Sequence, residues 1–128
     1  MKIAFVACSK NKQTFECSAK EMYSKSVLFS KTIKFCEKQF DEIFILPAKY
    51  GVLDLQQIIQ PYDETLNTFT KDQKREWVSK CLMKLKSMTT NSDSFYFFAG
   101  KNYELPLENS HFPMRGMGIG QRLNYLSK

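Results

Sequence analysis

The chain has 128 residues, of which 43% are hydrophobic and 25% are charged, and its net charge is +6. This length allows one packed domain, and this balance excludes a disordered chain. No apolar run reaches the roughly 20 residues of a membrane helix. The apolar start at residues 3–8 is shorter than a signal-peptide core of about 7–15 residues. We therefore expect a cytoplasmic protein without membrane contact.

The first half of the chain predicts two strands around one helix. Residues 3–8 are apolar on both faces, which is typical of a buried parallel strand. Ser18 and Glu21 have capping-box spacing, and apolar residues then recur at helical intervals, which predicts a helix over residues 18–39. Residues 43–46 form a second short apolar run and are expected to be the second strand.

The second half predicts a helix, a strand and a short terminal helix. Residues 52–69 are irregular, apart from a short extended piece at residues 58–59. A second capping box and a new helical period indicate a helix over residues 70–88. The apolar run at residues 95–99 is the third predicted strand, and residues 121–126 are the terminal helix.

Buried strands that alternate with long helices imply crossover connections and a largely parallel sheet. We therefore predict the α/β class, with a single Rossmann-like three-layer domain over residues 1–128 and a mostly parallel sheet of three to five strands. Trp77 begins the apolar face of the second long helix, and we expect it to be buried against this sheet.

The four cysteines form no C-x-x-C pair, and the chain has one histidine, so neither a zinc site nor a disulfide framework is expected. Cys36 and Cys81 fall on apolar helix faces, where a buried free thiol is the usual case. No sequence pattern indicates a cofactor. His111, in a loop flanked by proline, is expected at the surface.

The positive charge is concentrated near the start of the chain. Eight lysines face three glutamates in the first forty residues. Such an excess favours an anionic partner, which could be a nucleotide, a nucleic acid or a phosphorylated small molecule. A solvated basic helix face explains the same charges equally well.

Three loops follow the three predicted strands, and the carboxyl ends of parallel strands are where open α/β sheets bind ligands. Each loop carries lysine, which binds phosphate, and two of them carry glycine and tyrosine, which allow close backbone approach and base stacking. The alternative is that these are ordinary polar loops. The loops are Cys8-Ser9-Lys10-Asn11-Lys12, Lys49-Tyr50-Gly51 and Gly100-Lys101-Asn102-Tyr103.

Two further segments could belong to this site. Asp63, in the run that follows Pro61, offers a carboxylate for acid–base work or for stabilising a cation, although aspartate is also common as a turn cap. Asp54 is a second source of a carboxylate. The glycine-rich turn at residues 116–120 opens a helix, so it could bind an anion or simply pack the last helix.

Several segments carry a resemblance over nearly the whole chain. CSKNK, PAKYGVLD, IIQPYDETL, AGKNY and GMGIGQRL, in this order, resemble a family of small bacterial and phage proteins. AKYGVLD and IIQPYDETL are similar to the SGLYGVL and DLIQPY stretches of the YaaA peroxide-stress proteins, which bind DNA and protect it from oxidative damage. CSKNK resembles the Cys-Ser-x-x-Lys start of a domain of archaeosine synthase, which modifies a deazaguanine base in tRNA, although Gln13-Thr14 replace its Pro-Tyr.

The resemblance implies a nucleobase, nucleotide or nucleic-acid ligand. The leading hypothesis is therefore an enzyme that acts at a nucleobase or its N-glycosidic bond, and the rivals are a module that only binds a nucleotide and a YaaA-like DNA-binding stress protein. The predicted catalytic residues are Asp63, Lys49 and Ser9. The predicted ligand-binding residues are Cys8, Lys10, Lys12, Tyr23, Ser26, Tyr50, Gly51, Tyr62, Gly100, Lys101, Tyr103, Gly118, Gly120 and Gln121.

Overall fold

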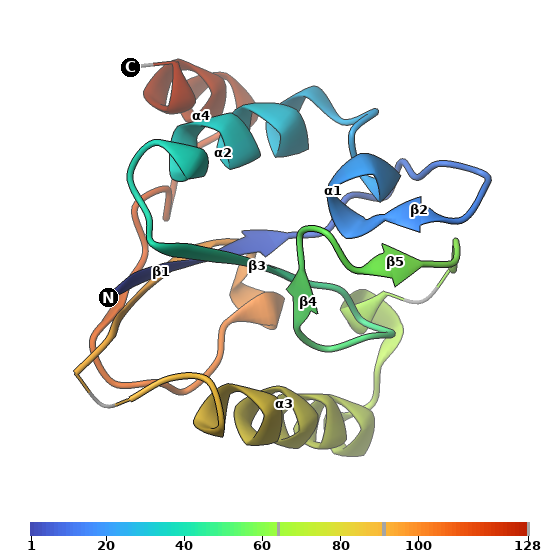
Figure 1. Ribbon diagram of the computed structural model, residues 1–128, viewed down its shortest axis with the longest axis vertical. Coiled ribbons are helices and arrows are strands. Elements are labelled where there is room, and N and C mark those ends of the chain that lie inside the picture. Colours follow the sequence, from blue (N-terminus) through green and yellow to red (C-terminus); the bar gives the residue numbers. More distant parts are fainter. Residues whose placement is uncertain (64, 91, 128) are drawn as a thin grey trace.

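The computed structural model describes residues 1–63, 65–90 and 92–127, without the side chain of Lys101. Its centre is a five-stranded sheet in the order β4-β3-β1-β6-β7 (Figure 1). Strands β1, β3, β6 and β7 are parallel, and β4 is the antiparallel edge. The strands are β1 Lys2–Ala7, β3 Glu42–Leu46, β4 Leu53–Asp54, β6 Ser94–Phe98 and β7 Ser110–His111.

Helices cover both faces of the sheet. Helices α1 (Ala19–Met22), α2 (Val27–Glu37) and α4 (Ile119–Leu126) lie on one face, and α3 (Lys71–Lys86) lies on the other (Figure 1). The α/β class and the mostly parallel sheet are therefore confirmed. Two short strands, β2 (Cys17–Ser18) and β5 (Ile58–Ile59), form a separate antiparallel pair, so the predicted extended piece at residues 58–59 is also confirmed. The 3-10 turns η1 and η2 span Leu66–Thr68 and Lys101–Tyr103.

The predicted helix over residues 18–39 is two helices, and that boundary was wrong. Helix α1 ends at Met22, and Ser26 begins α2 by accepting a hydrogen bond from the Phe29 amide at 3.2 Å. Between them, the Ser24 hydroxyl donates to the Glu21 carbonyl at 2.7 Å. Serine side chains that bond nearby backbone groups compete with the helix ladder, and this explains the break.

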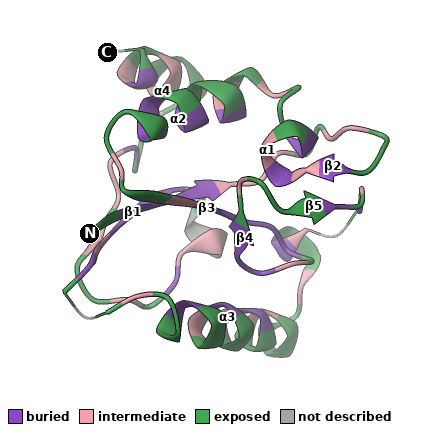
Figure 2. Cartoon of the chain, in the orientation of Figure 1, coloured by how far each residue is buried: buried purple, intermediate pink, exposed green. Residues whose placement is uncertain are grey.

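The core consists of two apolar clusters, one on each side of the sheet, so that buried positions follow the strands and the inner faces of the helices (Figure 2). Trp77 is 4% exposed, as predicted, and its indole Nε1 donates to the Pro47 carbonyl at 3.0 Å. Cys36 and Cys81 are buried, also as predicted, and all four cysteines are free thiols. No helix in the described part of the chain is long and apolar enough to cross a bilayer.

Candidate functional site

The chain changes its winding direction between β1 and β6. The connection from β1 to β3 runs through α1 and α2 on one face, and the connection from β3 to β6 runs through α3 on the other face (Figure 1). Ligands of open α/β sheets bind at this switch point, beyond the carboxyl ends of the strands. A cavity of about 510 Å³ lies there. Its described lining residues are Cys8, Ser9, Lys10, Lys12, Asp63, Thr65, Asn67 and Tyr103.

The loop after β1 supplies the cations of this switch-point cavity. The Ser9 hydroxyl accepts a hydrogen bond from the Asn11 amide at 3.1 Å, which turns the chain so that Lys10 and Lys12 follow closely. Lys10 is exposed. The Lys12 ammonium lies 4.7 Å from the centroid of the Tyr62 ring and donates to the Lys10 carbonyl at 3.4 Å. These contacts hold one positive charge against an aromatic face at the cavity wall.

Two buried tyrosine hydroxyls lie next to the half-buried Cys8 thiol of the cavity lining. Tyr23 and Tyr62 are 0% and 8% exposed, and their hydroxyl groups are hydrogen-bonded to each other. Burial raises the pKa of both tyrosines. Burial also raises the pKa of Cys8, although hydrogen bonds with Tyr62 and Tyr103 and the charge of Lys12 oppose the shift. Tyr23, Tyr62 and Cys8 are therefore neutral at pH 7, and each can donate and accept hydrogen bonds within the group.

The segment from residue 62 to residue 68 supplies the carboxylate. Asp63 is exposed and forms no hydrogen bond or ion pair with any other described residue. Thr65 then caps η1 by accepting from the Asn67 amide at 3.3 Å. The Asn67 side chain accepts from the Asn102 amide group at 3.0 Å, and this bond ties η1 to η2. Asp63 is thus held near the lysines of the β1 loop while its own charge stays unpaired within the described chain.

Tyr103 closes the cavity from the β6 side. It is half-buried, and its hydroxyl accepts from the Leu66 amide at 3.4 Å. Its ring packs edge-on against Trp77, with 5.9 Å between the ring centroids. Burial raises the pKa of Tyr103, so that it also remains a neutral phenol at pH 7.

The loop after β3 does not line this cavity. Lys49 is exposed, its ammonium lies 5.6 Å from the Tyr50 ring, and its carbonyl accepts from Lys80 of α3 at 3.3 Å. Tyr50 packs edge-on against Tyr62 at 5.6 Å, behind the buried hydroxyls. Gly51 has a φ of 77°, a left-handed backbone conformation that glycine adopts without steric cost, and this explains the glycine in this turn. The expectation that Lys49 and Tyr50 share a pocket with Ser9 and Asp63 is not met by this cavity.

Gly100 lines a neighbouring cavity of about 320 Å³, which we call the arginine cavity. Arg115, Gly116 and Arg122 also line it, together with Glu104, which forms an ion pair with Arg115. The predicted glycine-rich turn therefore lies close to Gly100, but not in the switch-point cavity.

The amide of Gly118 already donates to the Gln121 side chain at 2.8 Å, and Gly120 is exposed on α4. Ser26 is the N-cap of α2, which gives that serine a structural task. The side chain of Lys101 lies outside the described part of the chain.

Several residues that line the two cavities were not predicted, among them Thr65, Asn67, Arg115 and Arg122. Thr65 and Asn67 lie in the same segment as Asp63. Threonine is a common N-cap residue, and Thr65 caps η1, so this threonine was the sequence feature that could have marked the segment. Arg115 and Arg122 flank the glycine-rich turn, and their positive charge beside Gly116 could have marked them. Among the described residues, no group of three or more histidine, cysteine, aspartate or glutamate side chains could hold a metal ion.

Comparison with known proteins gives a family and no function. The model of a family of unknown function, DUF6884, matches residues 3–128. No curated protein and no solved structure matches the chain. The similarity to YaaA proteins and to archaeosine synthase therefore rests on the sequence segments alone.

Proposed function

We propose that this chain, which belongs to DUF6884, binds a nucleotide unit in the switch-point cavity and cleaves its N-glycosidic bond. The observation that carries the proposal is the combination in one cavity of two lysines, Lys10 and Lys12, with the Asp63 carboxylate, which has no partner among the described residues. A nucleotide offers the complementary groups, because its phosphate is anionic and its sugar becomes cationic as the base departs.

The lysines suit the phosphate. Lys10 is exposed and its ammonium has no ion pair among the described residues, so it can turn toward an anion. Lys12 is half-buried and is held on the Tyr62 ring, so its charge is fixed at the wall. Two cations near one exposed carboxylate leave a net positive site, which attracts a nucleotide from solution.

The polar groups between the lysines and β6 suit the sugar and the base. Thr65 and Asn67 offer a hydroxyl and an amide, which can donate to and accept from ribose and base edges. Tyr103 offers an aromatic ring beside them, and bases stack on such rings at about 1–3 kcal/mol each.

Asp63 is the group that can act on the bond. In hydrolysis, the bond between C1′ and the base nitrogen breaks and its electron pair leaves with the base, which takes up a proton. Water oxygen then forms a bond to C1′, and Asp63 can accept the proton that this water loses. The carboxylate also stabilises the positive charge that builds on the sugar in between.

The test measures release of free base. Wild-type protein and Asp63→Asn would be incubated with each nucleoside monophosphate and with short oligonucleotides, and mass spectrometry would follow free base and intact ligand. We expect wild type to release base, and Asp63→Asn to bind the same nucleotide without releasing it. Asp72→Asn, on the exposed start of α3, is the matched control and should behave as wild type.

Two results would contradict the proposal in different ways. Binding of a nucleotide that is recovered intact from the wild type would leave a nucleotide-binding module and remove the catalytic role of Asp63. The absence of binding by any nucleotide or oligonucleotide would remove the proposed ligand altogether.

A further inference from the structure

We infer that the nucleic-acid ligand is a single strand, and that it continues from the switch-point cavity past Arg115 into a groove beside β7. This inference rests on the proposed function, because it names the class of substrate for the same site. Three observations carry it: the hollows lie next to one another, the groove has a stacked aromatic pair, and the charged side chains that line the groove are cationic whereas those of the adjacent hollow beside β3 and β4 are acidic.

The groove has a volume of about 560 Å³ and lies between the exposed edge of β6–β7 and the helices α2 and α4. Its lining includes Lys2, Phe40, Tyr96, His111, Arg115 and Tyr125. No carboxylate belongs to the described lining of this β7 groove, so its charged side chains are cationic. An anionic chain is the complementary occupant.

The groove joins the arginine cavity through shared walls. Phe112 and Arg115 line both of them. The arginine cavity is lined by Gly100 and Glu104 and the switch-point cavity by Tyr103, so both cavities border turn η2. The three hollows therefore form a series along the segment that follows β6, as successive units of a polymer would require.

The β7 groove holds a place for an unpaired base. His111 lies beside Tyr96 in the parallel register of β7 and β6, and their rings stack at 4.5 Å with an angle of 19° between the planes. The Lys2 ammonium lies 5.2 Å from the Tyr96 ring. His111 is exposed, so a base can stack on the outer side of this pair. Bases in a duplex are already stacked and paired, and this favours a single strand.

Arg115 is positioned to hold a phosphate between the groove and the arginine cavity. Its guanidinium lies 4.0 Å from the centroid of the Phe112 ring, and its ion pair with Glu104 fixes its direction. A guanidinium has five N–H donors, and those left over from Glu104 can bind phosphate oxygens.

Four acidic side chains lie together in a hollow that borders the β7 groove at Phe40. This hollow, beside β3 and β4, is lined by Glu37, Asp41, Glu42 and Asp54, and by no lysine or arginine among the described residues. Because the charged side chains of the acidic hollow are anionic and those of the β7 groove are cationic, a polyanion is favoured in the groove over the hollow.

The experiment measures binding of labelled oligothymidylate of about ten nucleotides by fluorescence anisotropy, with thymidine monophosphate as the short ligand. Asp63→Asn would serve as background, because the strand then stays intact. We expect the oligonucleotide to bind at least about tenfold tighter than the monophosphate. His111→Ala should weaken it about fivefold or more, the lower end for loss of one stacked base. Arg115→Ala should lower the slope of log affinity against log salt by about 1.

Neither substitution should change binding of the monophosphate, and Arg75→Ala on α3 is the matched control for loss of one exposed arginine. If the monophosphate binds but the oligonucleotide gains nothing, or if His111→Ala and Arg115→Ala bind it as the background does, the single-strand track is wrong and the proposed function stands. An unlabelled duplex that competes as well as the single strand would also overturn the track. If neither thymidine monophosphate nor any other nucleotide or oligonucleotide binds, the proposed function fails, and the inference with it.

Discussion

The hydroxyl groups of Tyr23 and Tyr62 are hydrogen-bonded to each other inside the domain, 39 residues apart in sequence. Tyr23 is the C-cap of α1, and Tyr62 immediately precedes Asp63. The bond therefore connects the segment after β1 to the segment that carries the proposed catalytic carboxylate. It is part of the reason why Asp63 lies in the same cavity as Lys10 and Lys12.

Tyr62→Phe should lower the free energy of unfolding by about 1–3 kcal/mol, because the Tyr23 hydroxyl would stay buried without this partner. Replacing both tyrosines by phenylalanine should cost less than the sum of the two single changes, since no orphaned hydroxyl of the pair then remains. Urea denaturation of the four proteins measures this coupling. Costs that simply add would show that the two hydroxyls do not depend on each other.

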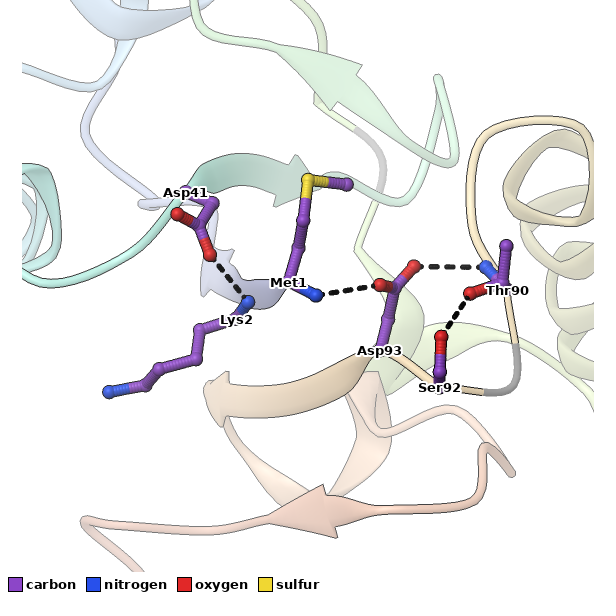
Figure 3. Close-up of polar contacts among 6 residues, drawn as sticks. All are labelled: Met1, Lys2, Asp41, Thr90, Ser92 and Asp93. Atoms are coloured by element: carbon purple, nitrogen blue, oxygen red, sulfur yellow. Dashed lines mark hydrogen bonds and ion pairs between the residues drawn. The ribbon is translucent and has the colours of Figure 1, made fainter.

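The second prediction concerns acid stability through Asp93. Its carboxylate accepts from the Thr90 amide at 2.9 Å and from the amino group of Met1 at 2.9 Å (Figure 3). These bonds lower the pKa of Asp93 below its ordinary 3.8, and the same contact raises the pKa of the Met1 amine above 8.0. The carboxylate's contribution to stability is complete above 3.8 and is lost as pH falls through the lowered pKa. The amine's contribution is complete below 8.0 and is lost as pH rises through the raised pKa.

Asp93→Asn should therefore destabilise the protein most between pH 3.8 and pH 8.0, and less at more acidic or more basic pH. Urea denaturation from about pH 2 to about pH 10 measures the difference from wild type. Asp72→Asn is the control, because its exposed i,i+3 pair with Arg75 contributes little. A difference that stays constant across the whole range would exclude the titration of this pair as the cause.

Trp77→Ala should destabilise the domain by about 3–5 kcal/mol, the range for emptying a large aromatic site in a core. Trp77→Phe keeps most of the packing and loses the bond to the Pro47 carbonyl, so about 1–3 kcal/mol is expected. Denaturant unfolding measures both. A loss below about 1 kcal/mol for the alanine variant would contradict the burial of this side chain.

The sequence predicts the centre of the fold because its signals there are local. Residues 3–8, 43–46 and 95–99 are apolar on both faces, and such runs become buried parallel strands. Strand β7 has two residues, Ser110 and His111, with no apolar alternation to reveal it. The break between α1 and α2 was hidden because the apolar spacing continues through it, while Ser24 and Ser26 make the decisive bonds.

Part of the site was predicted because the apolar runs that reveal the parallel strands also reveal where those strands end. The ends of β1 and β6 meet because both strands are parallel neighbours. The end of β3 does not join them at the cavity, because Lys80 and Lys84 of α3 donate to the carbonyls of Lys49 and Val52 and hold this loop toward α3. Contacts between residues 31 positions apart leave no periodic pattern in the sequence.

Cys8 offers a chemical probe of the switch-point cavity. It is half-buried and lines the cavity, while the other three cysteines are buried. Iodoacetamide should therefore modify Cys8 first in the native protein. Because burial raises the Cys8 pKa above 9.0, the rate should be slow at pH 7 and keep rising as pH passes 9. Mass spectrometry of the labelled peptides measures it, and a saturating nucleotide should slow it. Equal labelling of Cys8 with and without a nucleotide that binds would place that ligand elsewhere.

The last prediction separates two lysines that the sequence treats alike. Both follow strand ends, but Lys12 lines the switch-point cavity, whereas Lys49 does not and lies over Tyr50. A charge-assisted hydrogen bond to phosphate contributes about 1.5–3 kcal/mol. Lys12→Ala should therefore weaken nucleotide binding by roughly tenfold or more, and Lys49→Ala by less than about threefold.

Isothermal titration with a nucleoside monophosphate, and with the matching nucleoside as a ligand without phosphate, measures both effects. The loss in Lys12→Ala should disappear for the nucleoside, because only the phosphate contacts the ammonium. The two variants each remove one lysine, so their net charges are equal and long-range attraction cancels in the comparison. A larger loss in Lys49→Ala than in Lys12→Ala would move the phosphate to the end of β3, behind the tyrosine pair, and would separate it from Asp63.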